Sequence, residues 1–400
     1  MKSFWLLTGA SSVSTMGNTF LYVAVPLALL QSTDSPLLAV LSVAAQNLPY
    51  LLAPLLGPFI DRYDRRVLFA LGEVVQGLAV AAIPFALWHD EIWAVFLALF
   101  VIGLANVVSD VAGDYGLIPL LVPAEKLDRA SARFTALLLA ARFVGPALAG
   151  LIIAGLGSTW ALELDAVTFL LTALTTLAMP YARQEPTETS LVAMLKEGVA
   201  FFRSRADLRR LTLVTALYNV GAGALESTLI TVGRSDWQWS ARTLGVAMSI
   251  AAVAAAIGAW LAPRALVGDD RRRQLTICLG VCGIGTLGLL TPWPVVMVAG
   301  FAVLCLGEGG INAATMGYRQ QAIPDHLSGR VNAVIRTFVT GAVPVSSLLL
   351  GLTISLGSSA LVFAPVTAAV GASFLLWSTM RRPGPAERPL PPVIEERIAQ

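Results

Sequence analysis

Charged residues are scarce in this sequence. Only 13% of its 400 residues are Asp, Glu, Lys or Arg, whereas soluble domains carry about a quarter. Hydrophobic residues make up 56%, and the mean hydropathy is +0.74. This balance excludes an ordinary water-soluble domain and indicates a chain folded in lipid. The net charge of +2, with its cations dispersed, predicts no nucleic-acid partner.

Histidine and cysteine are also rare. His89 and His326 fall in separate predicted loops on opposite sides, so we expect no histidine-rich metal site. Cys278, Cys282 and Cys305 lie inside apolar segments, so we expect no disulfide. The sequence has no G-x-S-x-G, H-E-x-x-H or G-x-x-x-x-G-K-S/T motif. We therefore predict no enzyme activity and no cofactor, with energy drawn from an ion gradient or downhill flow.

Long uncharged segments define the fold class. A membrane-spanning helix needs about 20 residues, and the last segment, 337–380, is long enough to cross twice with a turn at Gly357-Ser358-Ser359. The sequence predicts an all-α membrane protein with twelve transmembrane helices. Their expected ranges are 4–30, 36–60, 67–88, 92–118, 131–156, 159–181, 209–232, 243–263, 274–290, 293–317, 331–356 and 360–380.

Basic residues predict the orientation. If the N-terminus is cytoplasmic, the outer loops hold only Arg234 and Arg242 of the 27 basic residues, which is the positive-inside pattern. The nine tryptophans fall near predicted helix ends, as in an aromatic belt. We expect a multi-pass protein of a bacterial cytoplasmic membrane, with both termini cytoplasmic.

The two halves of the chain repeat each other at an offset of 201 residues. Asn18 matches Asn219, and Gly150 matches Gly351, without a gap. This register predicts two pseudo-symmetric six-helix bundles, 1–181 and 209–380. The linker 182–208 fits either an amphipathic cytoplasmic helix or a solvated connection, and the Pro-rich residues 381–400 fit a cytoplasmic tail.

Residues 57–66 carry a motif between the second and third predicted helices. They read Gly-Pro-Phe-Ile-Asp-Arg-Tyr-Asp-Arg-Arg, which resembles the loop motif G-x-x-x-D-R-x-G-R-R of the major facilitator superfamily, with Asp64 in place of Gly. The resemblance implies a conformational latch between the halves, in which Asp61 faces the start of 331–356. The residues implied in this latch are Gly57, Asp61, Arg62, Arg65, Arg66 and Arg336.

A second motif lies in the predicted helix 131–156. Gly145, Pro146 and Gly150 resemble the G-P-x-x-G-G core of the antiporter motif of that superfamily, which marks exporters. Small residues allow close helix packing, and packing alone also explains them. Segments 142–146 and 165–169 further resemble the branch that holds macrolide and siderophore exporters.

Few ionisable residues fall inside the predicted helices. Each costs about 3 kcal/mol or more in lipid, so each needs a partner, water or a function. Asp110 and Arg142 are expected to pair, and Glu226 and Glu308 are the candidate proton carriers, because burial favours the neutral form of an isolated acid. Neighbouring polar residues complete the candidate substrate and proton site, namely Asn18, Tyr22, Asn219 and Asn312.

Other acids are expected to be structural. Glu73 lies near the inner surface and is expected to reach it, while Glu163 and Asp165 are expected to hold helix contacts or face the outer interface. The sequence thus predicts a monomeric, proton-coupled antiporter that exports small amphipathic molecules and contacts membrane lipid. A lipid or lysophospholipid transporter on the same fold, or a non-transporting sensor, is left open.

Overall fold

The computed structural model describes residues 2–60, 63–112, 121–122, 127–179, 191–265, 271–356 and 359–380. All regular elements within these residues are helices, because in lipid each helix satisfies its own backbone. They are α1 (Lys2–Thr33), α2 (Pro36–Asn47), η1 (Leu48–Leu52), α3 (Ala53–Ile60), α4 (Arg65–Trp88), α5 (Ile92–Ala112), α7 (Leu127–Leu156), α8 (Ser158–Leu177), α9 (Leu191–Ser204), α10 (Ala206–Ala222), α11 (Leu225–Ser235), α12 (Ala241–Ala265), α13 (Arg271–Leu289), α14 (Pro294–Ala322), α15 (Asp325–Val339), α16 (Val343–Ser355), α17 (Ser359–Val362) and α18 (Ala364–Thr379).

The helices coincide with all twelve predicted ranges. Among the described residues, nine helical segments are long and apolar enough to cross a membrane, and shorter apolar helices cover Ala140–Leu156 and Ala364–Thr379. Some predicted spans consist of two or more helices in sequence. For example, α2, η1 and α3 share the range 36–60, where Pro49 removes a backbone donor near the start of η1.

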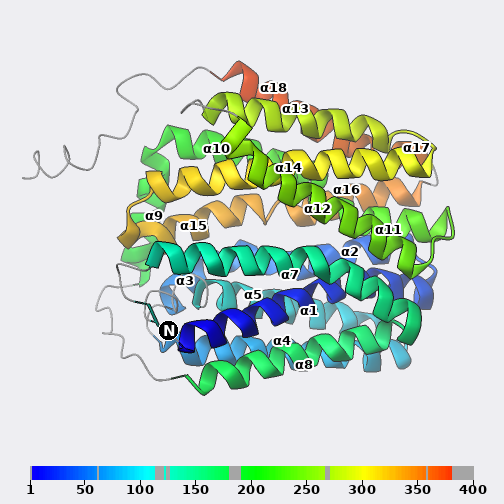
Figure 1. Ribbon diagram of the computed structural model, residues 1–400, viewed down its shortest axis with the longest axis horizontal. Coiled ribbons are helices and arrows are strands. Elements are labelled where there is room, and N and C mark those ends of the chain that lie inside the picture. Colours follow the sequence, from blue (N-terminus) through cyan, green and yellow to red (C-terminus); the bar gives the residue numbers. More distant parts are fainter. Residues whose placement is uncertain are drawn as a thin grey trace, which may run out of the picture.

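The helices form two bundles side by side (Figure 1). The first bundle contains α1 to α8, and the second contains α10 to α18. The bundles meet where α2 packs on α16, where α7 packs on α12, and where α11 contacts α1 and α2. These contacts draw on three helices of the first half of the chain, α1, α2 and α7.

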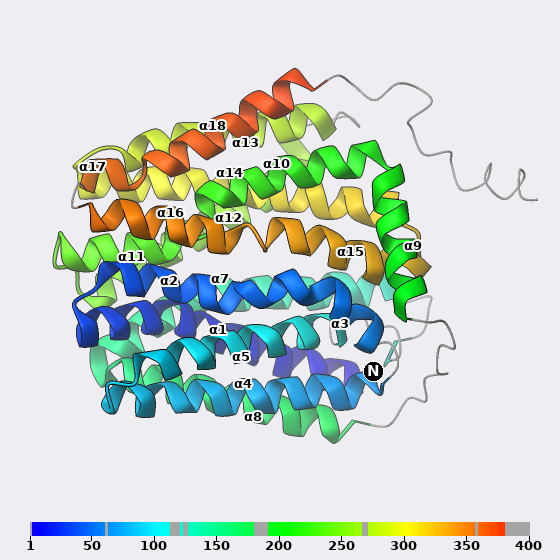
Figure 2. The ribbon, with the colours of Figure 1, turned by 180° about the vertical axis from the view of Figure 1, so that it is seen from behind.

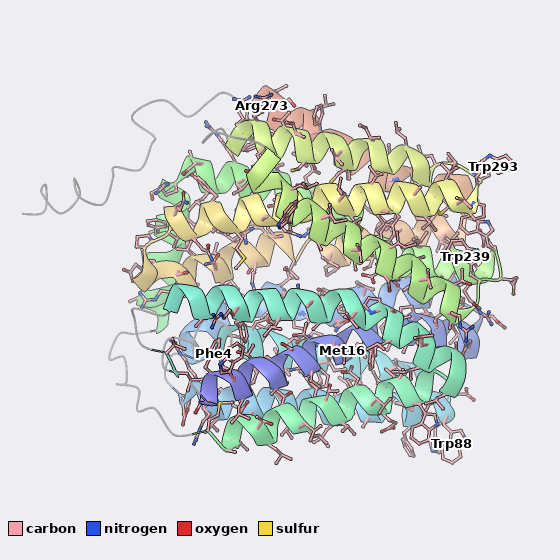
Figure 3. The ribbon with its side chains drawn as sticks, viewed as in Figure 1. Phe4, Met16, Trp88, Trp239, Arg273 and Trp293 are labelled. Carbon is pink, nitrogen blue, oxygen red and sulfur yellow. The ribbon has the colours of Figure 1, made fainter. Side chains whose placement is uncertain are left out.

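The two ends of the molecule differ in composition. Trp88, Trp239 and Trp293 lie at one end, which we call the tryptophan end, and Arg273 lies at the opposite end (Figure 3). The opposite end also carries α9, and we call it the α9 end (Figure 2). There α9 packs on α15 and contacts α3, so it touches both bundles.

Aromatic and charged contacts attach α9 to the second bundle. The rings of Phe202 and Phe338 stack with centroids 5.9 Å apart. Arg330 forms an ion pair with Glu197. The helix predicted in the linker is therefore a packed element and not only a connection.

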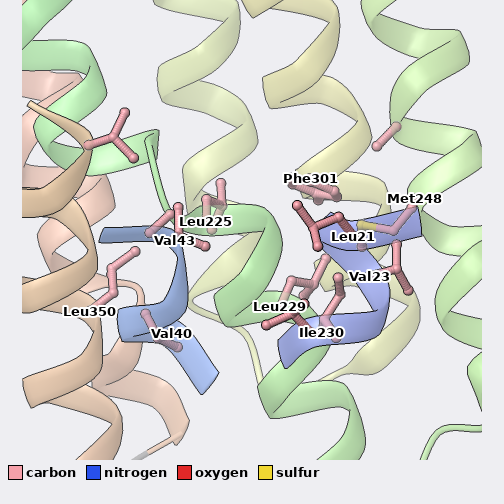
Figure 4. Packing of buried hydrophobic residues seen from close by; sticks show 14 of the residues in the cluster. Leu21, Val23, Val40, Val43, Leu225, Leu229, Ile230, Met248, Phe301 and Leu350 are labelled. Atoms are coloured by element: carbon pink, nitrogen blue, oxygen red, sulfur yellow. The ribbon is translucent and has the colours of Figure 1, made fainter. Parts of the chain in front are cut away.

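Toward the tryptophan end, the bundles pack through buried apolar side chains (Figure 4). Leu21 of α1 lies near Leu229 of α11, and Val40 of α2 lies near Leu350 of α16. The hydroxyl of Ser227 on α11 also donates to the carbonyl of Ala39 on α2, at 3.3 Å. Burial of these side chains holds the bundles together at this end.

Two spans of the second bundle, α10–α11 and α15–α16, are interrupted. At each break a side chain of the other span bonds backbone groups that have lost their helical partners. The break between α10 and α11 leaves the N–H of Ala224 to bond the Ser346 hydroxyl on α16, at 3.0 Å, and this hydroxyl donates to Gly221 O at 3.2 Å. Near the break between α15 and α16, the carbonyl of Val339 accepts from the Asn219 amide on α10, at 2.8 Å. Neighbouring helices thus satisfy backbone groups that lipid cannot.

The Ser346 bridge gives a stability prediction. We expect Ser346→Ala to lower the free energy of unfolding by about 1–2 kcal/mol, because it leaves buried backbone groups without partners. Ser347 is equally buried but donates only within its own helix, to Val343 O, so Ser347→Ala is the matched control and should cost about 0.5 kcal/mol or less. Reversible unfolding in mixed micelles measures both. Equal losses in the two variants would contradict this account of the break.

Candidate substrate and proton site

Polar residues from both bundles converge between them. Tyr22 lies well inside both ends of the long helix α1, yet its side chain is 37% exposed. The charges of Asp110 on α5, Arg142 on α7 and Glu226 on α11 all act on its hydroxyl. We call Tyr22, Asp110, Arg142, Glu226 and Glu308 the central site.

Two acids of the second bundle form one side of the central site. Glu226 is exposed, lies in the first turn of α11, and is close enough to Glu308 of α14 for their charges to interact. The phenol of Tyr218 on α10 donates to Glu308 Oε2 at 3.2 Å. The positive end of the α11 dipole favours negative charge at Glu226, whereas a charged Glu308 opposes it.

Asp110 does not pair with Arg142 as the sequence led us to expect. Its Oδ2 accepts from Arg336 of α15 at 2.5 Å and from the Tyr50 hydroxyl at 2.9 Å. The prediction was wrong because it compared depths along helices of one bundle, whereas α15 of the other bundle packs on α3 and η1 and its Arg336 side chain reaches Asp110. This ion pair therefore joins the bundles, and Arg142 remains exposed in the central site.

The candidate asparagines have different surroundings. Asn312 on α14 is exposed. Asn18 on α1 has a buried Oδ1 with no hydrogen-bond partner among the described residues. Asn219 is committed to the Val339 carbonyl, so its amide supports the break in α15–α16. The first two are thus the asparagines with capacity to bind a ligand.

Part of the loop motif lies outside the described residues, namely Asp61 and Arg62. Gly57 falls within α3. Asp64 caps α4, since its Oδ1 accepts from Arg66 N at 2.9 Å. The Arg66 guanidinium donates to the carbonyl of Met179, just past α8, at 2.5 Å. Arg66 therefore ties α4 to α8 within the first bundle.

The antiporter-type motif lies at two close helix contacts. A Cβ on Gly145 would lie 2.9 Å from Thr19 Cβ of α1. A Cβ on Gly150 would lie 2.7 Å from Gly245 Cα of α12, in the other bundle. Only glycine permits the second approach, because α7 and α12 meet backbone to backbone there.

The expectation for Glu73 was wrong, since this residue is 4% exposed and does not reach the inner surface. Asp165 is fully buried against Gly17 of α1, which agrees with a helix contact and not with a place at the outer interface. Tyr50 and Tyr218 were not among the candidates, although each bonds an acid of the central site. Each tyrosine bonds an acid on another helix, and the hydrophobic pattern along one helix does not indicate such a contact.

Comparisons with known proteins agree with this arrangement. A profile of the Major Facilitator Superfamily matches residues 7–266 and 211–396. The multidrug efflux pump Tap of Mycobacterium tuberculosis is 30% identical over 365 residues, covering 87% of this chain and 86% of that protein. Macrolide efflux protein A of Streptococcus pyogenes is 22% identical over 367 residues, covering 86% and 88%. A bacterial homologue of the iron transporter ferroportin, solved in an inward-facing state, superposes with a TM-score of 0.73 at 18% identity over 95% and 99% of the two chains.

The family match and the efflux-pump relatives identify an integral, multi-pass membrane transporter. The chain belongs to the Major Facilitator Superfamily. Its family and these relatives are transporters, so the chain is a transporter and not an enzyme.

The Asp110–Arg336 pair can be tested by a double-mutant cycle. Removal of one partner leaves the other charge uncompensated, but both side chains are about 30% exposed, so we expect a coupling energy of about 1–2 kcal/mol between Asp110→Asn and Arg336→Gln. Arg142→Gln is the control and should be additive with Asp110→Asn. Unfolding free energies in micelles give both cycles, and coupling to Arg142 in place of Arg336 would reject the pairing.

The Gly150 contact predicts a steric effect. Gly150→Ala should push α7 from α12 and lower the unfolding free energy by about 1–3 kcal/mol. Gly155 lies on the same helix with nothing within 4 Å of an added Cβ, so Gly155→Ala should be neutral or slightly stabilising. Thermal unfolding of the two purified variants makes the comparison. If Gly150→Ala were as stable as Gly155→Ala, the close approach of the bundles would be wrong.

Proposed function

We propose that this chain is a proton-driven antiporter that exports small amphipathic molecules, of drug, macrolide or siderophore type, by alternating access. The observation that carries the proposal is the joint presence of Glu226 and Glu308 in the central site, where their charges interact. The names of the relatives, a multidrug efflux pump and a macrolide efflux protein, support the substrate class.

The two acids can couple protons to substrate by competition. A proton bound by one of them removes their mutual repulsion, and a positively charged substrate does the same. The proton and the substrate therefore each weaken the binding of the other to the central site, and the arrival of one favours the release of the other. Asn18, Tyr22 and Asn312 add polar and aromatic contacts suited to a varied set of amphipathic ligands.

Alternating access requires each end of the interface to open in turn. At the tryptophan end, separation would expose the apolar contacts around Leu21 and Leu229. Toward the α9 end, it would break the Asp110–Arg336 pair and part α3 from α15. In this mechanism Arg336 acts as the latch residue, with Asp110 as its partner among the described residues.

The orientation follows from charge. The proposal assigns the α9 end, with Arg273, to the cytoplasm, because basic residues are retained on that side. Both termini would then face the cytoplasm of a bacterial cell, and a monomer would be the transporting unit, since one chain contains the whole central site.

Proton flux in proteoliposomes tests the proposal. A cationic dye such as ethidium, or a macrolide such as erythromycin, is used to elicit the flux. We expect the Glu226→Gln, Glu308→Gln double variant to reduce this proton flux at least tenfold, because an amide cannot carry the proton. Each single variant should lose part of it. A pH-sensitive dye trapped in the vesicles reports the flux.

Glu163→Gln, an acid outside the central site on α8, is the control and should leave the flux unchanged. Unchanged flux in both single variants and in the double would sink the assignment of the proton to these acids.

A further inference from the structure

A second group of polar side chains is buried inside the first bundle, away from the central site. Its members come from four helices and are each at most 6% exposed. We call this group the buried acid cluster: Ser14 on α1, Glu73 and Gln76 on α4, Ser109 on α5, and Asp165 on α8.

Hydrogen bonds connect α1, α4 and α5 within the buried acid cluster. The Ser14 hydroxyl donates to Glu73 Oε2 at 3.0 Å. The Gln76 amide nitrogen donates to Ser109 Oγ at 3.2 Å and approaches Glu73 Oε1 at 3.4 Å. Glu73 therefore lies within a polar network that extends over three helices.

Asp165 reaches the same region from α8. Its Oδ1 accepts a long hydrogen bond of 3.4 Å from Thr168, and its carboxyl group lies against Gly17 of α1, where a side chain would collide with it. The charge of Glu73 acts on it. Two carboxyl groups thus interact inside an apolar bundle.

Some acceptors in this region lack donors. Asp165 Oδ2 and Gln76 Oε1 are buried and have no hydrogen-bond partner among the described residues. If the Gln76 amide is turned over, its oxygen faces Glu73 Oε1 instead, and two acceptors then meet unless a proton lies between them. In either orientation Asp165 Oδ2 has no donor among the described residues, and a proton on this carboxyl group would remove its charge.

Among the residues that the structure describes, the contacts of this region bring no cation to Asp165. From α4 the group that faces Asp165 is Glu73. On α7, Arg142 acts on Tyr22 in the central site, and Arg133 lies over the Trp5 ring with its guanidinium 6.0 Å from the centroid. Asp110 on α5 is committed to Arg336, and Glu163 on α8 adds only negative charge.

We propose that the buried acid cluster is a proton-binding site, with the proton on Asp165 and Glu73 as its interacting neighbour. Proton binding turns Asp165 from a buried anion into a neutral group with an O–H donor, which removes the cost of burying the charge. This site is separate from the central site and does not depend on the proposed function.

The position of the cluster gives the proton a structural consequence. Ser14 and Gly17 face the cluster, while Asn18 and Tyr22, on the same helix, belong to the candidate substrate and proton site. Removal of the proton would place a charge against the backbone of α1 at Gly17. The protonation state therefore acts on the packing of α1 against α8.

Infrared spectroscopy of the full chain in nanodiscs tests this assignment. In the Glu226→Gln, Glu308→Gln background, we expect the carbonyl stretch of a protonated carboxylic acid to persist at pH 7, to shift in D2O, and to be lost when Asp165→Asn is added. Glu163→Gln, on the same helix, is the control and should leave the band unchanged. Aspartate labelled with 13C at the side-chain carboxyl gives the same assignment without a substitution, since the band should then shift.

Two results would overturn the proposal. The first is a band that neither Asp165→Asn nor labelled aspartate alters. The second is loss of the band when Na+ replaces choline at constant pH, because the oxygens would then bind a metal cation and not a proton. The Asp165→Asn variant has the shape of the protonated acid, and gel filtration verifies that it folds. A failure of the flux experiment on Glu226 and Glu308 leaves this readout unaffected.

Discussion

Ser346 of α16 holds the α10–α11 span together at the point where its own helical hydrogen bonds are interrupted. In the same way, the Asn219 amide of α10 donates to the Val339 carbonyl at the end of α15. In lipid an unbonded backbone group costs several kcal/mol, so neither break is stable without the other span beside it. This reciprocal arrangement fixes the start of α11, and with it the location of Glu226 opposite Glu308.

The two bundles use their acids differently although the chain repeats at an offset of 201 residues. In the second bundle the interrupted α10–α11 span brings Glu226 to the central site, where it is exposed, and the continuous helix α14 carries Glu308 close enough for the two charges to interact. In the first bundle α1 is continuous from Lys2 to Thr33, and the acids Glu73 and Asp165 are buried within the bundle. The break before α11 thus presents Glu226 to the central site, whereas Glu73 and Asp165 stay buried.

The sequence was sufficient to predict the fold because one strong constraint, burial in lipid, shapes each span independently of the others. The ranges and the helices that carry Glu226, Glu308 and Arg142 followed from that local signal, and the family followed from the motifs at 57–66 and 145–150. The partner of Asp110 did not, because the approach of Arg336 depends on how α15 packs on α3 and η1 of the other bundle. The burial of Asp165 was also out of reach, since it depends on Gly17, a residue of another helix.

The ends of the interface are held by forces of different kinds, and this difference matters for movement. At the tryptophan end the bundles are joined by apolar side chains and by the backbone contact of Gly150 with Gly245, both of which lose all their energy over a short separation. Toward the α9 end Asp110 and Arg336 are already partly exposed, so water can replace their bond at modest cost. The two ends therefore resist separation differently, and in the proposed antiport mechanism a proton or a bound cation at the central site shifts the balance between them.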